Sequence, residues 1–147
     1  MKIFVDTNVV LDTCLPARPG RQMSEAVLSM ENPAETRIYM SSLTVANAAY
    51  FLRKHEGKAH ASNVISRLFK DHFVLPVNDM NVYEALRSDC PDFEDALQFS
   101  CADYGNCDCI ITKNVTDFRG HSPLPVFTPE EFLAGCRAAA AKAREKK

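Results

Sequence analysis

Three acidic side chains in this sequence stand where a metal ion or a phosphate group could be bound. Asp6 directly follows the apolar run 3–5, which is typical of a buried strand. Asp95 lies in the first turn of a predicted helix, and Asp117 lies in a loop after a later strand. Carboxylates from separate segments repel one another unless a cation joins them. The three acids therefore predict a site for Mg²⁺ or Mn²⁺, at which a water molecule bound to the metal would attack a phosphodiester bond. Taken alone, Asp6 could equally be a helix cap.

Short polar side chains lie near these acids along the chain. Asn8 follows Asp6 by two residues and can hydrogen-bond its carboxylate or cap the next helix. Asn47 is the one polar side chain in the middle of an apolar helix, so it either bonds locally or points to the end of the second strand. Asp92 and Glu94 open a later helix, where acids have a structural explanation because they complement the helix dipole.

The order of elements indicates an α/β fold with a mostly parallel sheet of four or five strands. The apolar helix at 43–55 is expected to be largely buried, and 113–118 is expected to be a loop. Ligands bind at the carboxyl ends of strands in such sheets, which is where Asp6 and Asp117 fall. Strands are predicted at 3–5, 38–40, 73–77, 109–112 and 126–127. Helices are predicted at 21–31, where Asn32 and Pro33 end the helix, at 43–55 and at 58–70. Further helices are predicted after a cap at Asn78 or Asp79, from a cap at Asp92 to Gly105, and from Pro129 to a frayed end at 142–147.

Length and composition favour one ordinary globular domain over residues 1–147. The chain has 46% hydrophobic and 24% charged residues and a formal net charge of −2, which argues against a wholly basic nucleic-acid binder but allows a local basic patch. No apolar run approaches a membrane span and no signal-peptide pattern opens the chain, so a cytoplasmic protein is expected. The six cysteines form no CxxC pair, and most are expected to be reduced core thiols.

Four motifs in this chain resemble the PIN domain, and they are most similar to the VapC-type toxin ribonucleases of toxin–antitoxin systems. The resemblance implies a three-layer α/β/α sandwich, cleavage of RNA that depends on Mg²⁺ or Mn²⁺, a homodimer, and an antitoxin protein that blocks the site. The first and last motifs together carry most of its specificity. The motifs lie at residues 5–12 (VDTNVVLD), 41–44 (SSLT), 95–98 (DALQ) and 110–118 (IITKNVTDF).

The resemblance assigns site residues at matching positions of this sequence. Asp6 matches the first acid of the family and Asp95 matches the acid that opens the late helix. Asn114 and Asp117 match the loop of the fourth acid, in which only Asp117 is charged. The departure is Asn47, because the family usually has a glutamate there. With Asn114 also neutral, metal binding is expected to be weaker than in a site with four acids.

Hydrolysis of an RNA phosphodiester is therefore the expected reaction, with Asp6, Asp95 and Asp117 as the metal-binding and catalytic acids. Lys113 and Arg119 could contact the RNA backbone, or they could be ordinary solvated charges. The residues expected to orient the ligands or the attacking water are Asn8, Asn47, Asp92, Thr112 and Asn114.

Two alternatives stay open on the residues alone. A metal-dependent phosphohydrolase or a phospho-accepting receiver could use Asp6 as a covalent nucleophile. Such phosphohydrolases have a second acid two residues on, where this chain has Asn8, and only Lys113 stands near the place of a receiver's lysine. A non-catalytic RNA- or protein-binding module with the same fold is favoured by the neutral Asn47 and Asn114.

Overall fold

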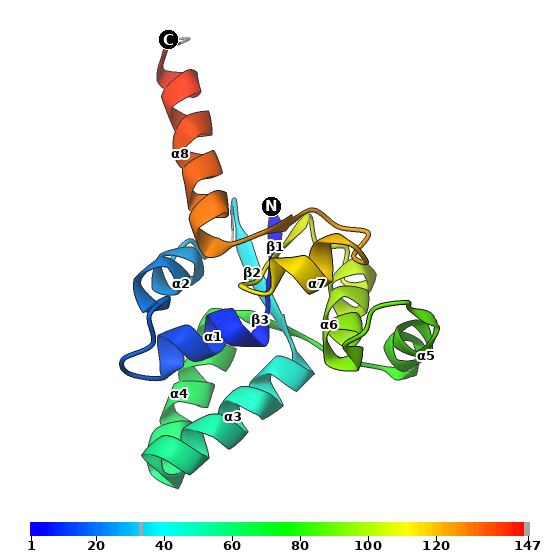
Figure 1. The fold of residues 1–147 in the computed structure, drawn as a ribbon. Helices are drawn as coiled ribbons and strands as arrows, with labels where there is room; N and C mark the ends of the chain where they lie inside the picture. Colours follow the sequence, from blue (N-terminus) through cyan, green and yellow to red (C-terminus); the bar gives the residue numbers. More distant parts are fainter. Residues whose placement is uncertain (33, 146–147) are drawn as a thin grey trace.

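Strand β1 (Lys2–Val5) lies at the centre of a parallel sheet (Figure 1). The computed structural model describes residues 1–32 and 34–145, and within them the strand order is β3-β2-β1-β4-β5. β1 pairs with β2 (Arg37–Ser41) on one side and with β4 (Cys109–Ile111) on the other. β3 (Phe73–Leu75) and β5 (Val126–Phe127) complete the two edges. Because every pair is parallel, the carboxyl ends of all these strands meet at one edge of the sheet.

Helices cover both faces of the sheet, which gives three layers. Side chains of a strand alternate between faces, so Ile3 and Val5 pack with α1, α2, α3, α4 and α8, whereas Phe4 packs with α5, α6 and α7. The expected α/β/α sandwich is thus confirmed. The helices of the described residues are α1 (Thr7–Cys14), α2 (Arg21–Leu28), α3 (Ser42–Glu56), α4 (Lys58–Asp71), α5 (Asp79–Arg87), α6 (Phe93–Tyr104), α7 (Val115–Arg119) and α8 (Pro129–Glu145).

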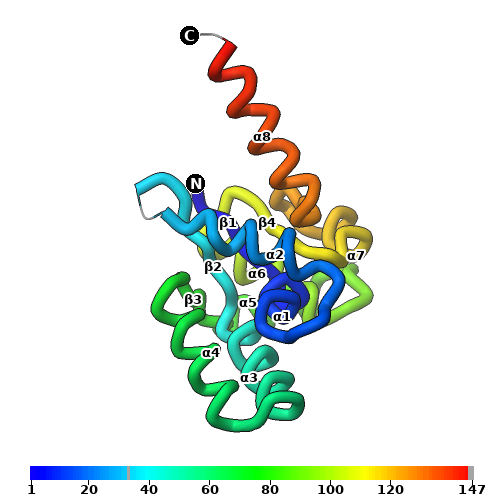
Figure 2. The backbone as a smooth tube through the Cα atoms, turned by 90° about the vertical axis from the view of Figure 1, so that its left-hand side faces the viewer, coloured from blue at the N-terminus to red at the C-terminus, as the bar shows by residue number. Residues whose placement is uncertain are grey.

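Helix α3 is less buried than its apolar composition suggested. Only Thr44, Ala48 and Leu52 are buried along it, and Tyr50 is 63% exposed. α3 packs against α1 and α4 (Figure 2), so the side chains on its remaining surface face outward. The expectation of a largely buried helix was therefore wrong, because composition does not say how many sides of a helix are covered.

The segment expected to be a loop after β4 contains the short helix α7. Phe118 of this helix is fully buried and contacts Phe99 of α6 edge to face, with ring centroids 6.1 Å apart. Because residues 115–119 are helical, the side chain of Phe118 packs against α6. Asp117 therefore lies in α7 rather than in a loop, which corrects its expected position.

The carboxyl-terminal helix α8 starts as the sequence predicted and then leaves the body of the molecule (Figure 1). Thr128 Oγ1 accepts a hydrogen bond from the amide of Glu131 at 3.1 Å, and the Glu131 carboxylate accepts one from the amide of Thr128 at 2.9 Å. This reciprocal pair is a capping box. Only Pro129 and Phe132 of α8 are buried.

Two further features of residues 1–32 and 34–145 are the state of the cysteines and the character of the helices. None of the six cysteines forms a disulfide there, and four of them are buried. No helix in these ranges combines the length and apolar character needed to cross a bilayer. Two predictions lie outside the described residues. They concern Pro33, which was expected to help end the helix at 21–31, and residues 146–147 of the expected frayed end.

Candidate active site

Asp6 stands at the junction of β1 and α1 at the carboxyl edge of the sheet. It is only 3% exposed. One carboxylate oxygen, Oδ1, accepts a hydrogen bond from the amide of Thr7 at 2.6 Å, so Asp6 is the N-cap of α1. The helix-cap interpretation of the sequence is thus correct, and it leaves the second oxygen of Asp6 for other partners.

The second oxygen of Asp6 joins β1 to the chain that leaves β4. Asp6 Oδ2 accepts hydrogen bonds from Asn8 Nδ2 at 2.6 Å and from Thr112 Oγ1 at 2.7 Å. Burial raises the pKa of Asp6 to about 6, even though the hydrogen bonds from Thr112, Thr7 and Asn8 act in the opposite direction. Two of the expected supporting residues, Asn8 and Thr112, therefore contact the first acid directly.

Asp95 approaches the same edge from α6. Its Oδ2 accepts a hydrogen bond from Asn114 Nδ2 at 2.7 Å. Burial is the largest cause that raises the pKa of Asp95 to about 7, and the negative charge of Asp6 is the next. Further contributions come from the charges of Asp92, Asp117 and Glu94. Acids from β1, α6 and α7 therefore lie close enough to repel one another, as the sequence predicted.

The first turn of α6 holds two more acids with different partners. Asp92 Oδ1 accepts hydrogen bonds from the amides of Glu94 at 2.8 Å and Asp95 at 3.1 Å, so Asp92 is the expected N-cap. Glu94 Oε1 accepts a hydrogen bond from Asn47 Nδ2 of α3 at 2.7 Å. Glu94 was expected chiefly to complement the helix dipole. Its place beside the predicted site residue Asp95 was the available signal for a larger role.

A hollow of about 200 Å³ lies over these acids. Asp117 is half-buried in α7 and is not one of the residues that line the hollow. Its negative charge contributes to the raised pKa of Asp95. The hollow is open to a ligand between α1 and the start of α6. It is lined by Asp6, Thr7, Asn8, Leu11, Asp92, Glu94 and Asp95.

A buried glutamine fixes the three helices that carry these groups. Gln98 of α6 is 1% exposed. Its Nε2 donates to Thr7 Oγ1 at 2.9 Å and to Thr44 Oγ1 at 3.1 Å, and its Oε1 accepts from Ser41 Oγ at 2.7 Å. The starts of α1 and α3 are thereby joined to the middle of α6 by hydrogen bonds. Sequence reasoning missed Gln98, which it placed only within a family motif.

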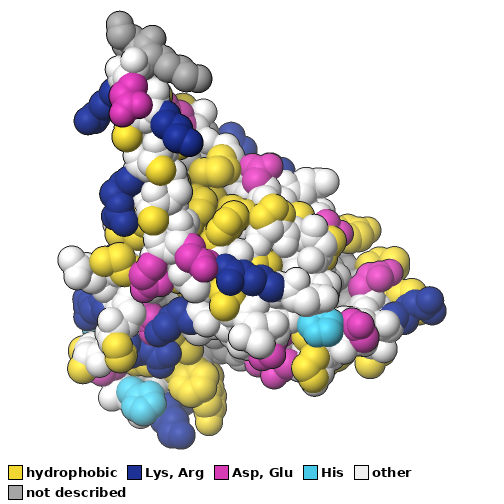
Figure 3. All heavy atoms as spheres, turned by 45° about the horizontal axis from the view of Figure 1, so that its top comes forward, with side chains coloured by type: hydrophobic (Ala, Val, Ile, Leu, Met, Phe, Trp, Pro, Cys, Tyr) yellow, Lys and Arg dark blue, Asp and Glu magenta, His cyan; other side chains and the backbone are white. Residues whose placement is uncertain are grey.

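The two basic residues expected to contact RNA are both engaged in ion pairs. Lys113 Nζ lies 2.8 Å from Asp12 Oδ2, and Asp12 is fully buried. Arg119 pairs with Glu131 of α8. Figure 3 shows acidic and basic side chains interspersed over one face of the molecule. Any RNA contact by Lys113 or Arg119 would share these side chains with their acidic partners.

The polar groups of the site fit a hard divalent cation in kind but do not form a closed cage. No group of three or more His, Cys, Asp or Glu side chains within the described part of the chain is arranged to hold a metal ion by itself. Mg²⁺ commonly binds through one or two carboxylates and keeps several waters. Asp6 and Asp95 offer such carboxylates. Burial is the main cause of the raised pKa of each, and neighbouring negative charges add to it, so a cation in the hollow would be favoured by both carboxylates.

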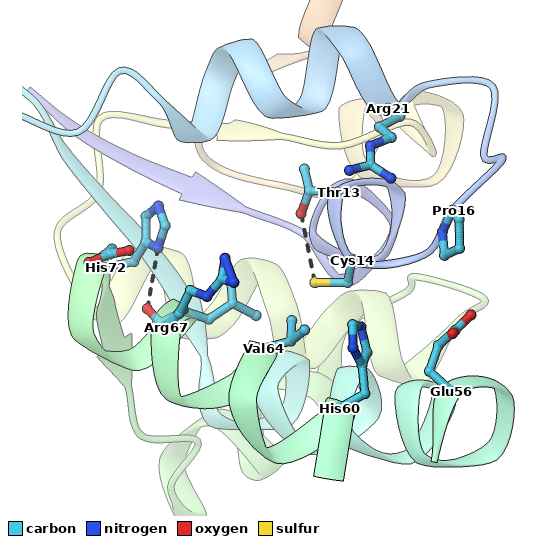
Figure 4. A pocket seen from close by; sticks show the side chains of 11 residues that line it. Thr13, Cys14, Pro16, Arg21, Glu56, His60, Val64, Arg67 and His72 are labelled. Carbon is cyan, nitrogen blue, oxygen red and sulfur yellow. Dashed lines mark hydrogen bonds between the residues drawn. The ribbon is translucent and has the colours of Figure 1, made fainter. Parts of the chain in front are cut away.

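A separate hollow of about 360 Å³ lies between α1, α2 and α4. Figure 4 shows Arg21, His60 and Arg67 around this space, with Thr13 and Cys14 on the side of α1. Among the described residues it shares no lining residue with the hollow over the acids. These basic side chains therefore do not belong to the acidic site.

Comparisons with known proteins give one sequence family and a consistent fold. Residues 2–116 match the family described as PIN domain. A comparison with curated proteins found no match. Three similar solved structures are VapBC2 from Rickettsia felis bound to a promoter DNA fragment, the sarcin–ricin loop cleaving toxin VapC20 from Mycobacterium tuberculosis, and VapBC-1 from nontypeable Haemophilus influenzae.

These structures are similar to the chain in fold at low sequence identity. For VapBC2 the identity is 15% and the TM-score 0.67, with 87% of this chain and 98% of that chain covered. For VapC20 the values are 16% and 0.65, with 80% and 94% covered. For VapBC-1 they are 20% and 0.66, with 88% and 99% covered.

Proposed function

The chain belongs to the PIN-domain family, and on this premise we propose that it is an endoribonuclease that requires Mg²⁺ or Mn²⁺. The observation that carries the proposal is the meeting of Asp6 and Asp95 at one hollow, each held by a polar side chain from beyond β4. A bound divalent cation would neutralise charge on a phosphodiester and lower the pKa of a water molecule. The net reaction adds water across one P–O bond of RNA.

The proposed roles of the other residues follow from their contacts. Thr112 and Asn8 hold the carboxylate of Asp6, while Asn114 holds that of Asp95. Holding a ligand by a second set of hydrogen bonds fixes its orientation and adjusts its basicity. Asp117 adds negative charge from α7 and acts as the third acid. Asp92 keeps the first turn of α6, and hence Asp95, in place.

Lys113 and Arg119 remain proposed contacts for the RNA backbone. Each is near the acidic site in sequence, and each has an exposed side chain, with Lys113 38% and Arg119 46% accessible. A phosphate group could share the ammonium of Lys113 with Asp12 without removing the pair. Their contribution to RNA binding is expected to be modest and to fall with salt concentration.

We also propose that the chain is the toxin of a type II toxin–antitoxin pair and acts as a homodimer. The support is the fold shared with VapC20 and with toxin–antitoxin complexes such as VapBC-1. Light scattering of the purified chain tests the dimer. Co-expression with the product of a neighbouring reading frame, followed by purification through a tag on this chain, tests the antitoxin. A monomer, or purification of this chain alone, would contradict the respective part.

Incubation with total cellular RNA tests the central proposal. We expect discrete cleavage in the presence of Mg²⁺ or Mn²⁺, and its loss with EDTA, in Asp6→Asn and in Asp95→Asn. Asp103→Asn is a matched control, because Asp103 is an exposed acid in the last turn of α6. Circular dichroism establishes that each variant is folded. Cleavage that persists in folded Asp95→Asn, or intact RNA with every metal, would contradict the proposed activity and favour a binding module.

A further inference from the structure

Glu94 is placed differently from an acid that only complements a helix dipole. Glu94 lines the same hollow as Asp6 and Asp95. The Asn47 amide donates to Glu94 Oε1 at 2.7 Å, so the side chain reaches from α6 across to α3. A helix-dipole interaction requires an acid in the first turn, but it does not require a partner on another helix.

The charge of Glu94 is unfavourable where it lies. Glu94 lines the same hollow as Asp6, Asp92 and Asp95, so its negative charge lies among those of three other acids. No basic side chain in the described residues forms a salt bridge with Glu94. An acid held in this position therefore disfavours the cation-free cluster, and a divalent cation in the hollow would reverse the sign of its contribution.

Helix α3 brings an amide rather than an acid to this side of the hollow. Asn47 is neutral, and its Nδ2 atom is within hydrogen-bond distance of a Glu94 oxygen. The two side chains thus meet at one point, one supplying the negative charge and the other a hydrogen-bond donor. A single glutamate at position 47 would bring its charge to the same region from α3.

We propose that Glu94 supplies the carboxylate on the α3 side of the divalent-cation site, and that Asn47 is a positioning residue that holds it there. This inference rests on the proposed function, because it concerns the same site. It assigns to α6 two acids of the site, Asp95 and Glu94. It also gives Asn47 a role that depends on its donor nitrogen.

Titration calorimetry with Mn²⁺ at pH 8 tests the inference without measuring RNA cleavage. We expect Glu94→Gln to weaken Mn²⁺ binding about tenfold or more, because loss of a ligand should cost at least as much as loss of a residue that supports one. The melting temperature of Glu94→Gln in EDTA is expected to rise, since a repulsive charge is removed. Glu130→Gln is the matched control, because Glu130 is an exposed acid in the first turn of α8, and neither quantity is expected to change.

An exchange of charge between the two helices provides the second arm. The double variant Asn47→Glu with Glu94→Gln returns one carboxylate to the α3 side, and we expect it to regain most of the Mn²⁺ affinity lost in Glu94→Gln. Equal Mn²⁺ affinity in the unsubstituted chain, Glu94→Gln and Glu130→Gln would overturn the inference and leave the proposed metal dependence intact. Absence of Mn²⁺ binding by the unsubstituted chain would overturn both.

Discussion

The side-chain amide of Gln98 donates a hydrogen bond to Thr7 Oγ1 at 2.9 Å and so joins α6 directly to α1. Thr7 is the residue after Asp6, and Gln98 lies three residues after Asp95, on neighbouring positions of one helix surface. The relative position of the two acids is therefore controlled by a buried polar contact that contains neither of them.

Replacing Gln98 by leucine is expected to destabilise the fold. The substitution leaves the buried hydroxyls of Thr7, Ser41 and Thr44 without their shared partner, which costs about 1–3 kcal/mol. The melting temperature should fall by roughly 3–9 °C for a chain of this size. Gln22→Leu is the matched control, because Gln22 is exposed on α2. An unchanged melting temperature in Gln98→Leu would show that the network adds no stability.

Asp95 makes the stability of the cation-free chain depend on pH. Its pKa is about 7 in the folded chain, against an ordinary value of 3.8. Between about pH 4 and pH 7 the folded state holds a proton that the unfolded state has lost, so the stability contributed by this proton decreases as pH rises. Asp6, with a pKa of about 6, acts in the same direction over a narrower range.

We therefore expect Asp95→Asn to be more stable than the unsubstituted chain at pH 8 in EDTA. A rise in melting temperature of roughly 3 °C corresponds to about 1 kcal/mol at this size. The difference should shrink towards pH 4, where the carboxyl group is protonated in both states. Thermal melts across pH 4–8 measure it, and a parallel shift of both chains at every pH would argue against the raised pKa.

Lys113 is expected to contribute to stability through Asp12. Burial by itself raises the pKa of Asp12, but hydrogen bonds from Lys113 and Arg18 lower it below its ordinary value. Lys113→Met leaves the buried carboxylate with Arg18 as its remaining basic partner. We expect a loss of about 1–2 kcal/mol in urea unfolding, less than for a fully buried pair because Lys113 is partly exposed. Lys58→Met, at an exposed position of α4, should leave the unfolding midpoint unchanged.

The close approach of Gly20 to the same ion pair leads to a further prediction. A Cβ atom on Gly20 would lie 2.1 Å from Asp12 Oδ2 and 2.9 Å from Lys113 Nζ. Gly20→Ala must displace this pair, and we expect a loss of about 1–3 kcal/mol. Gly135→Ala in α8 meets no atom within 4 Å and should stabilise the chain by about 0.5–1 kcal/mol. Chemical denaturation of the two variants side by side should move their midpoints in opposite directions.

The sequence was sufficient for those features that depend on neighbouring residues. The apolar run 3–5 followed by Asp6 placed an acid at the end of a central strand, and the helix predicted from Pro129 begins there, behind the capping box of Thr128 and Glu131. The hydrogen bond from Asn8 to Asp6 was also expected, since Asn8 is close in sequence. In each case a local rule and the fold favour the same arrangement.

Features that depend on distant partners could not be read from the chain. The side chain of Glu94 is directed by Asn47, which lies 47 positions away, and Lys113 is paired with Asp12 across 101 positions. Helix α7 has five residues, too few for helical periodicity to distinguish it from a loop. The exposure of Tyr50 depends on which helices surround α3, and the composition of α3 does not predict its neighbours.

The pairing of β1 with β4 also determines when this site can first exist. Asp6 is synthesised well before its partner Thr112, which is 106 positions later. Chains fold from the amino terminus as they are made, so β1 must wait with one edge unpaired until β4 has been synthesised. Until then a nascent chain lacks the hydrogen bond that joins Asp6 to the chain beyond β4. For an enzyme proposed to cut RNA, this order of synthesis means that no active site can assemble beside the message and the ribosome before β4 has been made.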